Sequence, residues 1–97
     1  MNIPKTLKIG AHTFVVTRSG GLSVDDNFGK IDMTKLEIFM RNDVPQSQQD
    51  ETLIHEAYHA IRKISGLEIK DSDEEEHHVQ CIGHLLYLFL KENKFIT

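Results

Sequence analysis

Residues 52–61 of this 97-residue chain read TLIHEAYHAI, and they lie within a longer segment of helical periodicity. Apolar side chains recur there every three or four residues, which places them in one stripe along a helix. The stripe comprises Leu53, Ile54, Ala57, Ala60, Ile61 and Ile64. Gly66 follows, and glycine readily adopts the left-handed conformation that ends many helices. We therefore predict a helix from about Gln48 to Ser65.

The second half of the chain carries further signals for the starts of helices. Ser47 is a candidate N-cap of the first helix, and Asp50 and Glu51 are then expected in its first turn, where the helix dipole favours negative charge. The sequence SDEE at residues 72–75 has the pattern of a capping box. A second helix is therefore predicted from Ser72 towards Asn93.

The first half of the chain alternates polar and apolar residues in the manner of β-strands. Leu7–Ile9 and His12–Thr17 form a predicted β-hairpin, and Leu36–Arg41 is a third predicted strand. The segment Ser19–Gly29 is rich in glycine and short polar residues, so we expect a surface loop there. Strands followed by helices indicate an α+β fold with a small antiparallel sheet of about three strands and then two main helices. We expect one domain, spanning residues 1–97.

Composition argues against several classes of function. The formal net charge is −4 and the Lys and Arg residues are scattered, so nucleic acid is not expected as a partner. The N-terminus lacks the apolar segment of a secretory signal, and the longest apolar run, Cys81–Leu90, is too short to span a membrane. The single cysteine, Cys81, has no intramolecular disulfide partner, and its place in an apolar run predicts a buried thiol. These features favour a cytoplasmic protein.

The HEAYH segment combines residue types suited to binding and using a metal ion. His55 and His59 are four residues apart and lie on one helical face, so both imidazoles can reach one ion. Glu56 is rotated by about 100° from His55, which places its carboxylate beside the ion as a general base. A zinc ion lowers the pKa of its coordinated water to about 7. The segment thus predicts one Zn2+ held by His55 and His59, with Glu56 as the catalytic residue.

A catalytic zinc ion usually has three protein ligands, so a third ligand is needed. A metzincin would have a glycine at position 62 and a histidine at 65, but this chain has Arg62 and Ser65. The second predicted helix offers four candidates instead, which are Glu76, Glu75, His77 and His78. Glu76 begins a ladder of residues that faces the first helix, while Glu75 lies nearer the centre of the apolar stripe. We predict Glu76 and keep the other three as alternatives.

Three further residues have simpler interpretations. His84 projects away from the Glu76 edge of its helix, and His12 lies in a strand, so neither is predicted to bind metal. Tyr58 could donate a hydrogen bond to an oxyanion. It lies in the apolar stripe, however, where an aromatic residue usually packs in the core.

These features together resemble a known family, the small HExxH metallopeptidases of the ImmA/IrrE-like group, which are gluzincins common in bacterial genomes and prophages. The resemblance covers most of the chain. It rests on KIG at residues 8–10, Gly29 before the strand at 36–40, TLIHEAYHAI, and a glutamate-rich helix start that leads to LLYLFLKEN at 85–93. In that family a glutamate three residues before a small apolar position completes the zinc site. Its equivalent here is Glu76, which precedes Val79.

The resemblance implies a metallopeptidase in which a small sheet packs on the active-site helix and its edge strand receives an extended peptide. The expected reaction is hydrolysis of a peptide bond in a protein or peptide substrate, with zinc as the cofactor. The chain departs from longer members because it lacks their helix-turn-helix or regulatory segments, and its His77-His78 pair is unusual.

Two other hypotheses come from different classes of protein. In the first, His77 or His78 completes a closed, structural zinc site in a non-catalytic interaction module of phage or mobile-element origin. In the second, the chain is an interaction protein with an acidic surface that binds no metal.

Overall fold

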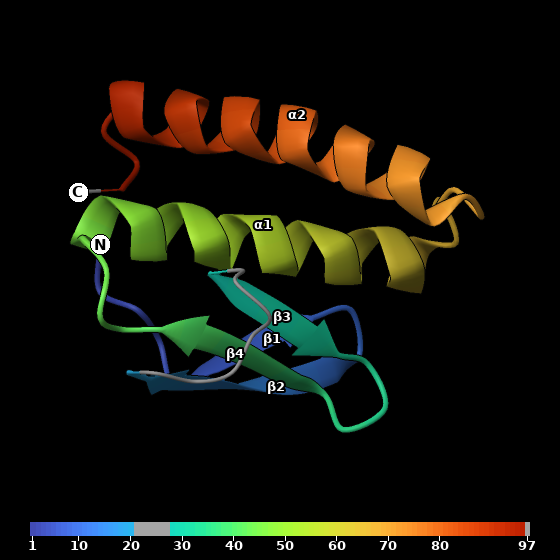
Figure 1. Ribbon diagram of the computed structural model, residues 1–97, viewed down its shortest axis with the longest axis horizontal. Coiled ribbons are helices and arrows are strands. Elements are labelled where there is room, and N and C mark those ends of the chain that lie inside the picture. Colours follow the sequence, from blue (N-terminus) through green and yellow to red (C-terminus); the bar gives the residue numbers. More distant parts are fainter. Residues whose placement is uncertain (21–27, 97) are drawn as a thin grey trace.

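The computed structural model consists of a four-stranded sheet and two helices, and the structure is described for residues 1–20 and 28–96. The sheet, the first helix and the second helix form three successive layers (Figure 1). In chain order the elements are β1 (Thr6–Ile9), β2 (His12–Ser19), β3 (Gly29–Asp32), β4 (Glu37–Arg41), α1 (Gln46–Ser65) and α2 (Ser72–Glu92). The predicted α+β fold is confirmed. The predicted loop at Ser19–Gly29 falls mostly on residues 21–27, outside the described residues.

The sheet has the strand order β1-β2-β4-β3 and is mixed, not wholly antiparallel. β1 and β2 form the predicted antiparallel hairpin, with Leu7 opposite Phe14. β2 and β4 pair in parallel, with Val16 opposite Ile38, and β3 pairs antiparallel with β4. β3 is only four residues long, so its sequence shows little alternation. The expected sheet of about three strands therefore has one additional short strand at its edge and one parallel pairing.

The hydrophobic core lies between α1 and one face of the sheet (Figure 1). Buried residues alternate with more exposed ones along β4, as the two-residue period of a strand requires. Strand and helix side chains meet in this core, which includes Phe14, Val16, Ile38, Met40, Leu53 and Ala60. The predicted apolar stripe of α1 turns only partly inward, since Ile61 and Ile64 stay exposed.

The start of α1 differs from the prediction. Pro45 occupies the N-cap position, with φ −53° and ψ 150°, and no side chain caps the helix. The prediction that Ser47 caps α1 is therefore wrong. The first turn also contains no acidic residue, so Asp50 and Glu51 lie beyond the position expected for them. Proline suits this place because its fixed φ is compatible with entry into a helix and it lacks the N–H that would be unpaired there.

The end of α1 and the start of α2 follow from local backbone chemistry. Gly66 has φ 77°, in the left-handed region, and its N–H binds the Arg62 and Lys63 carbonyls, so the predicted end of α1 is confirmed. The cap of α2 is one residue earlier than predicted. Asp71, not Ser72, accepts a hydrogen bond from the Glu74 N–H at 2.9 Å.

Of the elements that the structure describes, α1 alone packs against α2, so most of the surface of α2 faces outward (Figure 1). Its inward side buries Val79, Gly83 and Tyr87. Cys81 is exposed, so the prediction of a buried thiol is wrong. The apolar run that contains Cys81 has residues on all sides of α2, but only one side of the helix is buried. Neither helix has the length of apolar sequence that a membrane crossing requires, as far as residues 1–20 and 28–96 go.

Candidate metal centre

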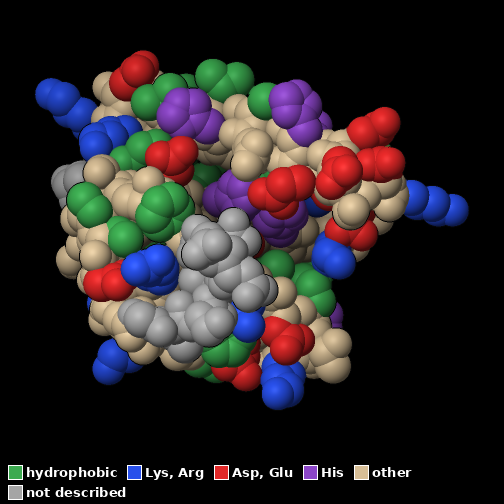
Figure 2. All heavy atoms as spheres, in the orientation of Figure 1, with side chains coloured by type: hydrophobic (Ala, Val, Ile, Leu, Met, Phe, Trp, Pro, Cys, Tyr) green, Lys and Arg blue, Asp and Glu red, His purple; other side chains and the backbone are tan. Residues whose placement is uncertain are grey.

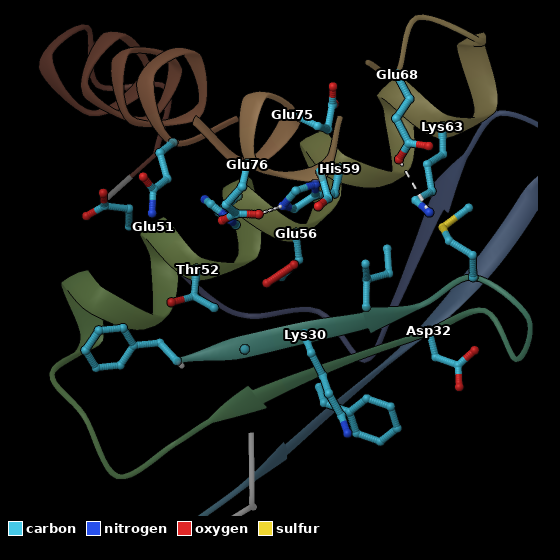
Figure 3. Close-up of a pocket in the computed structure, with 18 of the residues that line it drawn as sticks. Lys30, Asp32, Glu51, Thr52, Glu56, His59, Lys63, Glu68, Glu75 and Glu76 are labelled. Atoms are coloured by element: carbon cyan, nitrogen blue, oxygen red, sulfur yellow. Dashed lines mark hydrogen bonds and ion pairs between the residues drawn. The ribbon is translucent and has the colours of Figure 1, made fainter. Parts of the chain in front are cut away.

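His55, His59 and Glu76 meet on one side of the molecule, between α1 and α2 (Figure 3). His55 Nε2 lies 3.0 Å from Glu76 Oε1, and His59 Nε2 lies 2.8 Å from Glu76 Oε2. The three potential ligand atoms all lie within 4.8 Å of one another. In the described part of the chain, no other group of three or more His, Cys, Asp or Glu residues has this proximity.

The two helices bring these side chains together. His55 and His59 are one turn apart on α1, and their rings meet edge to face with centroids 4.9 Å apart. α2 runs back along α1 (Figure 1). Its early residue Glu76 thereby contacts His55 and His59, near the middle of α1. The helices lie close together at Gly83, where an added Cβ would be in ordinary van der Waals contact with His55 Cα at 3.8 Å. The arrangement is the one predicted for a zinc site, and metal binding itself stays a prediction.

Glu56 lies below the histidines, between α1 and β3, and is only 6% exposed (Figure 3). Its carboxyl group adjoins Gly29 of β3, since a Cβ on Gly29 would lie 3.5 Å from Glu56 Oε2 and 2.6 Å from Thr52 Cγ2. Burial, and then the negative charge of Glu76, raises the pKa of Glu56 to about 8. A glycine at position 29 therefore lets β3 approach α1 at Thr52, next to this buried carboxyl.

The environment of His59 favours its neutral form. Burial is the main cause that lowers the pKa of His59, and it outweighs the opposing attraction of the Glu76 carboxylate. Neutral imidazole is the form that donates an electron pair to a metal ion. The lowered pKa of His59 therefore favours the form of its imidazole that can bind a metal ion.

Glu75, the first alternative ligand, has a different partner. Arg62 of α1 donates two hydrogen bonds to its carboxylate, from Nε at 2.5 Å and Nη2 at 3.1 Å, and the Ile69 N–H donates a third at 2.7 Å. The hydrogen bond from Arg62 is the largest cause that lowers the pKa of Glu75 to about 2. Since these donors occupy the buried Glu75 carboxylate, the geometry favours Glu76 as the third ligand.

The other two alternative ligands, His77 and His78, are also engaged elsewhere. His78 Nε2 lies 3.0 Å from Tyr58 Oη, and the two rings are stacked. His77 Nε2 lies 3.8 Å from Cys81 Sγ on the exposed side of α2. Tyr58 is thus partly buried between the helices and is not part of the main core. Neither of these imidazoles belongs to the group around His55.

A groove of about 1430 Å3 runs past the three potential ligands. β3 and the turn after it form one side, and α1 and α2 form the other. His84 also lines this groove, so the prediction that it projects away from the site is wrong. Its Nδ1 lies 2.8 Å from Glu51 Oε1. His12 lies on β2, exposed and outside the groove, as expected for a residue with no role in metal binding.

Sequence reasoning missed the two ion pairs that join α1 and α2 beside the site, Arg62–Glu75 and Glu51–His84. One signal was available for the first pair. Arg62 is seven residues after His55, which places the two side chains on nearly the same helical face, directed at the same neighbouring element. The acid-rich start of α2 is a natural partner for such an arginine.

Comparisons of this chain with models of protein families, with curated proteins and with solved structures found no match.

Proposed function

We propose that this protein is a zinc-dependent metallopeptidase that hydrolyses peptide bonds in a protein or peptide substrate. One observation carries the proposal. Two imidazoles and a carboxylate converge beside a buried glutamate, in a groove that runs along an edge strand of the sheet.

The donor set fits zinc. His55, His59 and Glu76 would hold the ion, and two nitrogens with one carboxylate oxygen are the ligands of many catalytic zinc sites. A structural site would need a fourth protein ligand. His77 and His78, which the hypothesis of a non-catalytic module requires, have other partners, and this supports a site open to water and substrate.

Bound zinc would polarise the scissile carbonyl and lower the pKa of water. The remaining chemistry belongs to residues of this chain. Glu56 is the general base: its carboxylate accepts a proton from the attacking water and then gives that proton to the leaving amine. Its burial beneath the groove excludes bulk water from this proton transfer. The double positive charge of the ion would favour the ionised carboxylate that a base requires, against the burial that raises its pKa.

β3 supports the binding of an extended backbone. The Arg41 N–H donates to the Phe28 carbonyl at 3.0 Å, and bonded positions alternate along an antiparallel pair. Lys30 is therefore turned towards β4, while Gly29 and Ile31 direct their N–H and C=O groups to the free edge. A substrate strand would pair with Gly29 and Ile31, next to Glu56.

Metal content tests the proposed site. We expect about one zinc ion per chain in the purified protein by elemental mass spectrometry, and loss of that zinc in His59→Ala. His84→Ala is the matched control, because His84 lines the same groove but lies outside the ligand group, and it should keep its zinc. A well-folded wild type that takes up no zinc from excess metal would refute the proposal.

Turnover tests the role of Glu56. Wild type should cleave members of a mixture of random-sequence peptides, with the cuts identified by mass spectrometry. Glu56→Gln should keep its zinc and lose at least about 100-fold in rate, since a general base contributes about 10²–10⁴-fold. Equal rates in the two proteins would remove Glu56 from the mechanism, and zinc binding without cleavage would favour the non-catalytic module.

A further inference from the structure

The outer face of α2 is apolar, and none of the described strands or helices packs against it. Residues 79–90 read VQCIGHLLYLFL, and only Val79, Gly83 and Tyr87 of these are buried. Helices that are apolar on all sides are normally covered on all sides. On α2 the exposed apolar residues form one strip, here named the outer strip, which consists of Ile82, Leu85, Leu86 and Phe89, with Phe95 packed against Phe89. Figure 2 shows hydrophobic side chains along the upper edge of the molecule, over α2.

We propose that this protein forms a homodimer in which the outer strip of α2 packs antiparallel against the outer strip of a second copy. The residues of the strip recur at intervals of three or four, so they form the ridge that a neighbouring helix needs for close packing. An antiparallel pair of identical helices has two-fold symmetry, which closes the assembly at two chains.

The exposed area matches that of a stable dimer. Ile82 is 41% exposed, Leu85 59%, Phe89 55% and Phe95 67%. A fully exposed aromatic side chain has an area of about 150–250 Å2, and an aliphatic one has somewhat less. Multiplied by the exposed fractions, these areas give the outer strip on the order of 500 Å2 of apolar surface. A homodimer interface of about 800 Å2 per partner that is about 65% apolar requires a similar area.

The helix dipole and the acidic first turn of α2 favour an antiparallel pairing with a second copy. The first turn of α2 carries Asp73, Glu74 and Glu75, whereas Lys91, Glu92 and Lys94 at the other end include both charges. In an antiparallel pair the acidic first turn of one helix is placed away from that of the other, and the two helix dipoles oppose each other. A parallel pair would place the two acidic first turns together.

The dimer leaves the groove open. The side of α2 that lines the groove carries Glu76, Gln80 and His84, which are four residues apart. Residues at this spacing stay on one side of a helix, so this side does not include the outer strip. Dimerisation is therefore independent of the proposed peptidase activity, and its test needs no metal or substrate.

Sedimentation equilibrium of the full chain tests the dimer. At about 100 μM, wild type should show twice the 11.1 kDa mass of one chain. Leu85→Lys and Phe89→Lys should each raise the dissociation constant at least about 100-fold, because both copies carry the new charge into the interface. Leu67→Lys is the matched control, since Leu67 is 68% exposed and lies outside the outer strip, and it should remain dimeric.

Cross-linking supplies a second readout that does not depend on the stability of a lysine variant. In a Cys81→Ser background, Leu85→Cys lies near the two-fold axis and should form a disulfide-linked dimer under mild oxidation, whereas Leu67→Cys should not. Monomeric wild type at 100 μM overturns the proposal and leaves the strip for another protein. A dimer that is unaffected by both lysine variants, or equal cross-linking of the two cysteine variants, also overturns it.

Discussion

α1 has two opposite neighbours, and it contacts them by different chemistry. Towards the sheet it buries an apolar centre, in which Leu53 and Ala60 meet Phe14, Ile38 and Met40, and this centre is flanked by the buried polar residues Gln49, Thr52 and Glu56. Towards α2 the contact is a ladder of polar pairs. From the C-terminal end of α1 these pairs are Arg62–Glu75, Tyr58–His78, His59 and His55 with Glu76, and Glu51–His84. Burial of apolar area stabilises the first contact, and charge and hydrogen bonds define the second.

Stability and the response to pH are expected in different parts of this domain. An apolar contact responds little to pH, whereas a ladder of carboxylates and imidazoles changes with every proton that binds. The apolar centre between the sheet and α1 therefore forms the stable platform. We expect pH to act on the position of α2 and on Glu56, which is buried beside β3.

The largest effect is expected on the apolar side. Phe14→Ala should lower the free energy of unfolding by about 3–5 kcal/mol, because it leaves a cavity at a fully buried position. Val15→Ala, at the neighbouring half-exposed residue, should cost less than about 1 kcal/mol. Urea denaturation followed by circular dichroism measures both. Similar losses for the two variants would contradict the view that this interface carries the stability.

A smaller effect is expected where the polar side is most buried. Glu75→Gln removes the charge that pairs with Arg62 and should lower Tm, though by less than Phe14→Ala. Glu74→Gln is the control, because Glu74 is exposed on the same turn of α2. Equal Tm values for wild type and Glu75→Gln would show that the buried pair adds nothing.

The same variant has a defined pH dependence. The pKa of Glu75 is lowered from 4.5 to about 2, so the pair stabilises the folded state above about pH 4.5 and this contribution is lost as the pH falls towards 2. The difference in stability between wild type and Glu75→Gln should therefore shrink between pH 4.5 and 2. A difference that stays constant across this window would contradict the assignment.

Glu56→Gln should increase stability in the metal-free protein. The pKa of Glu56 is raised from 4.5 to about 8, so its effect on stability is most favourable below pH 4.5 and is lost as the pH rises through 8. The variant should exceed wild type by about 4 kcal/mol at pH 8 and match it near pH 4.5. Denaturation in the presence of a chelator measures this, and equal stabilities at pH 8 would place Glu56 in a more polar environment.

The smallest effect is expected at an exposed pair on the rim of the groove. Lys63 Nζ lies 3.4 Å from Glu68 Oε2, with both side chains more than a third exposed. Glu68→Gln should change the free energy of unfolding by less than about 0.5 kcal/mol. A loss as large as that of Glu75→Gln would show that exposure does not separate the two pairs.

Local patterns predicted most of the fold. The hairpin, the strand at β4 and the end of α1 at Gly66 follow from alternation and from glycine chemistry within a few residues. The parallel pairing of β2 with β4 and the edge strand β3 did not, because they depend on contacts between distant segments. Caps were misplaced where two neighbouring residues have the same chemistry, as with Asp71 and Ser72.

The candidate site was predicted in part for the same reason. The spacing of His55 and His59 fixes their shared face, but the choice between Glu75 and Glu76 depends on how α2 is rotated against α1. Arg62 is the residue in the structure that distinguishes them, because it binds Glu75. Cys81 and His84 were misjudged because the periodicity of a helix does not reveal which of its sides has a neighbour.

The edge of β3 that pairs with no other described strand has a consequence for solubility. An unpaired strand edge can join the edge of any other chain, which is how many proteins begin to aggregate. Here the exposed edge is only four residues long, and Lys30 and Asp32 place opposite charges on it. An edge this short gives a stray strand few backbone bonds and no long apolar surface. A peptide held in the groove would gain its remaining contacts from the helices, so the protein would favour chains that enter the groove over copies of its own sheet.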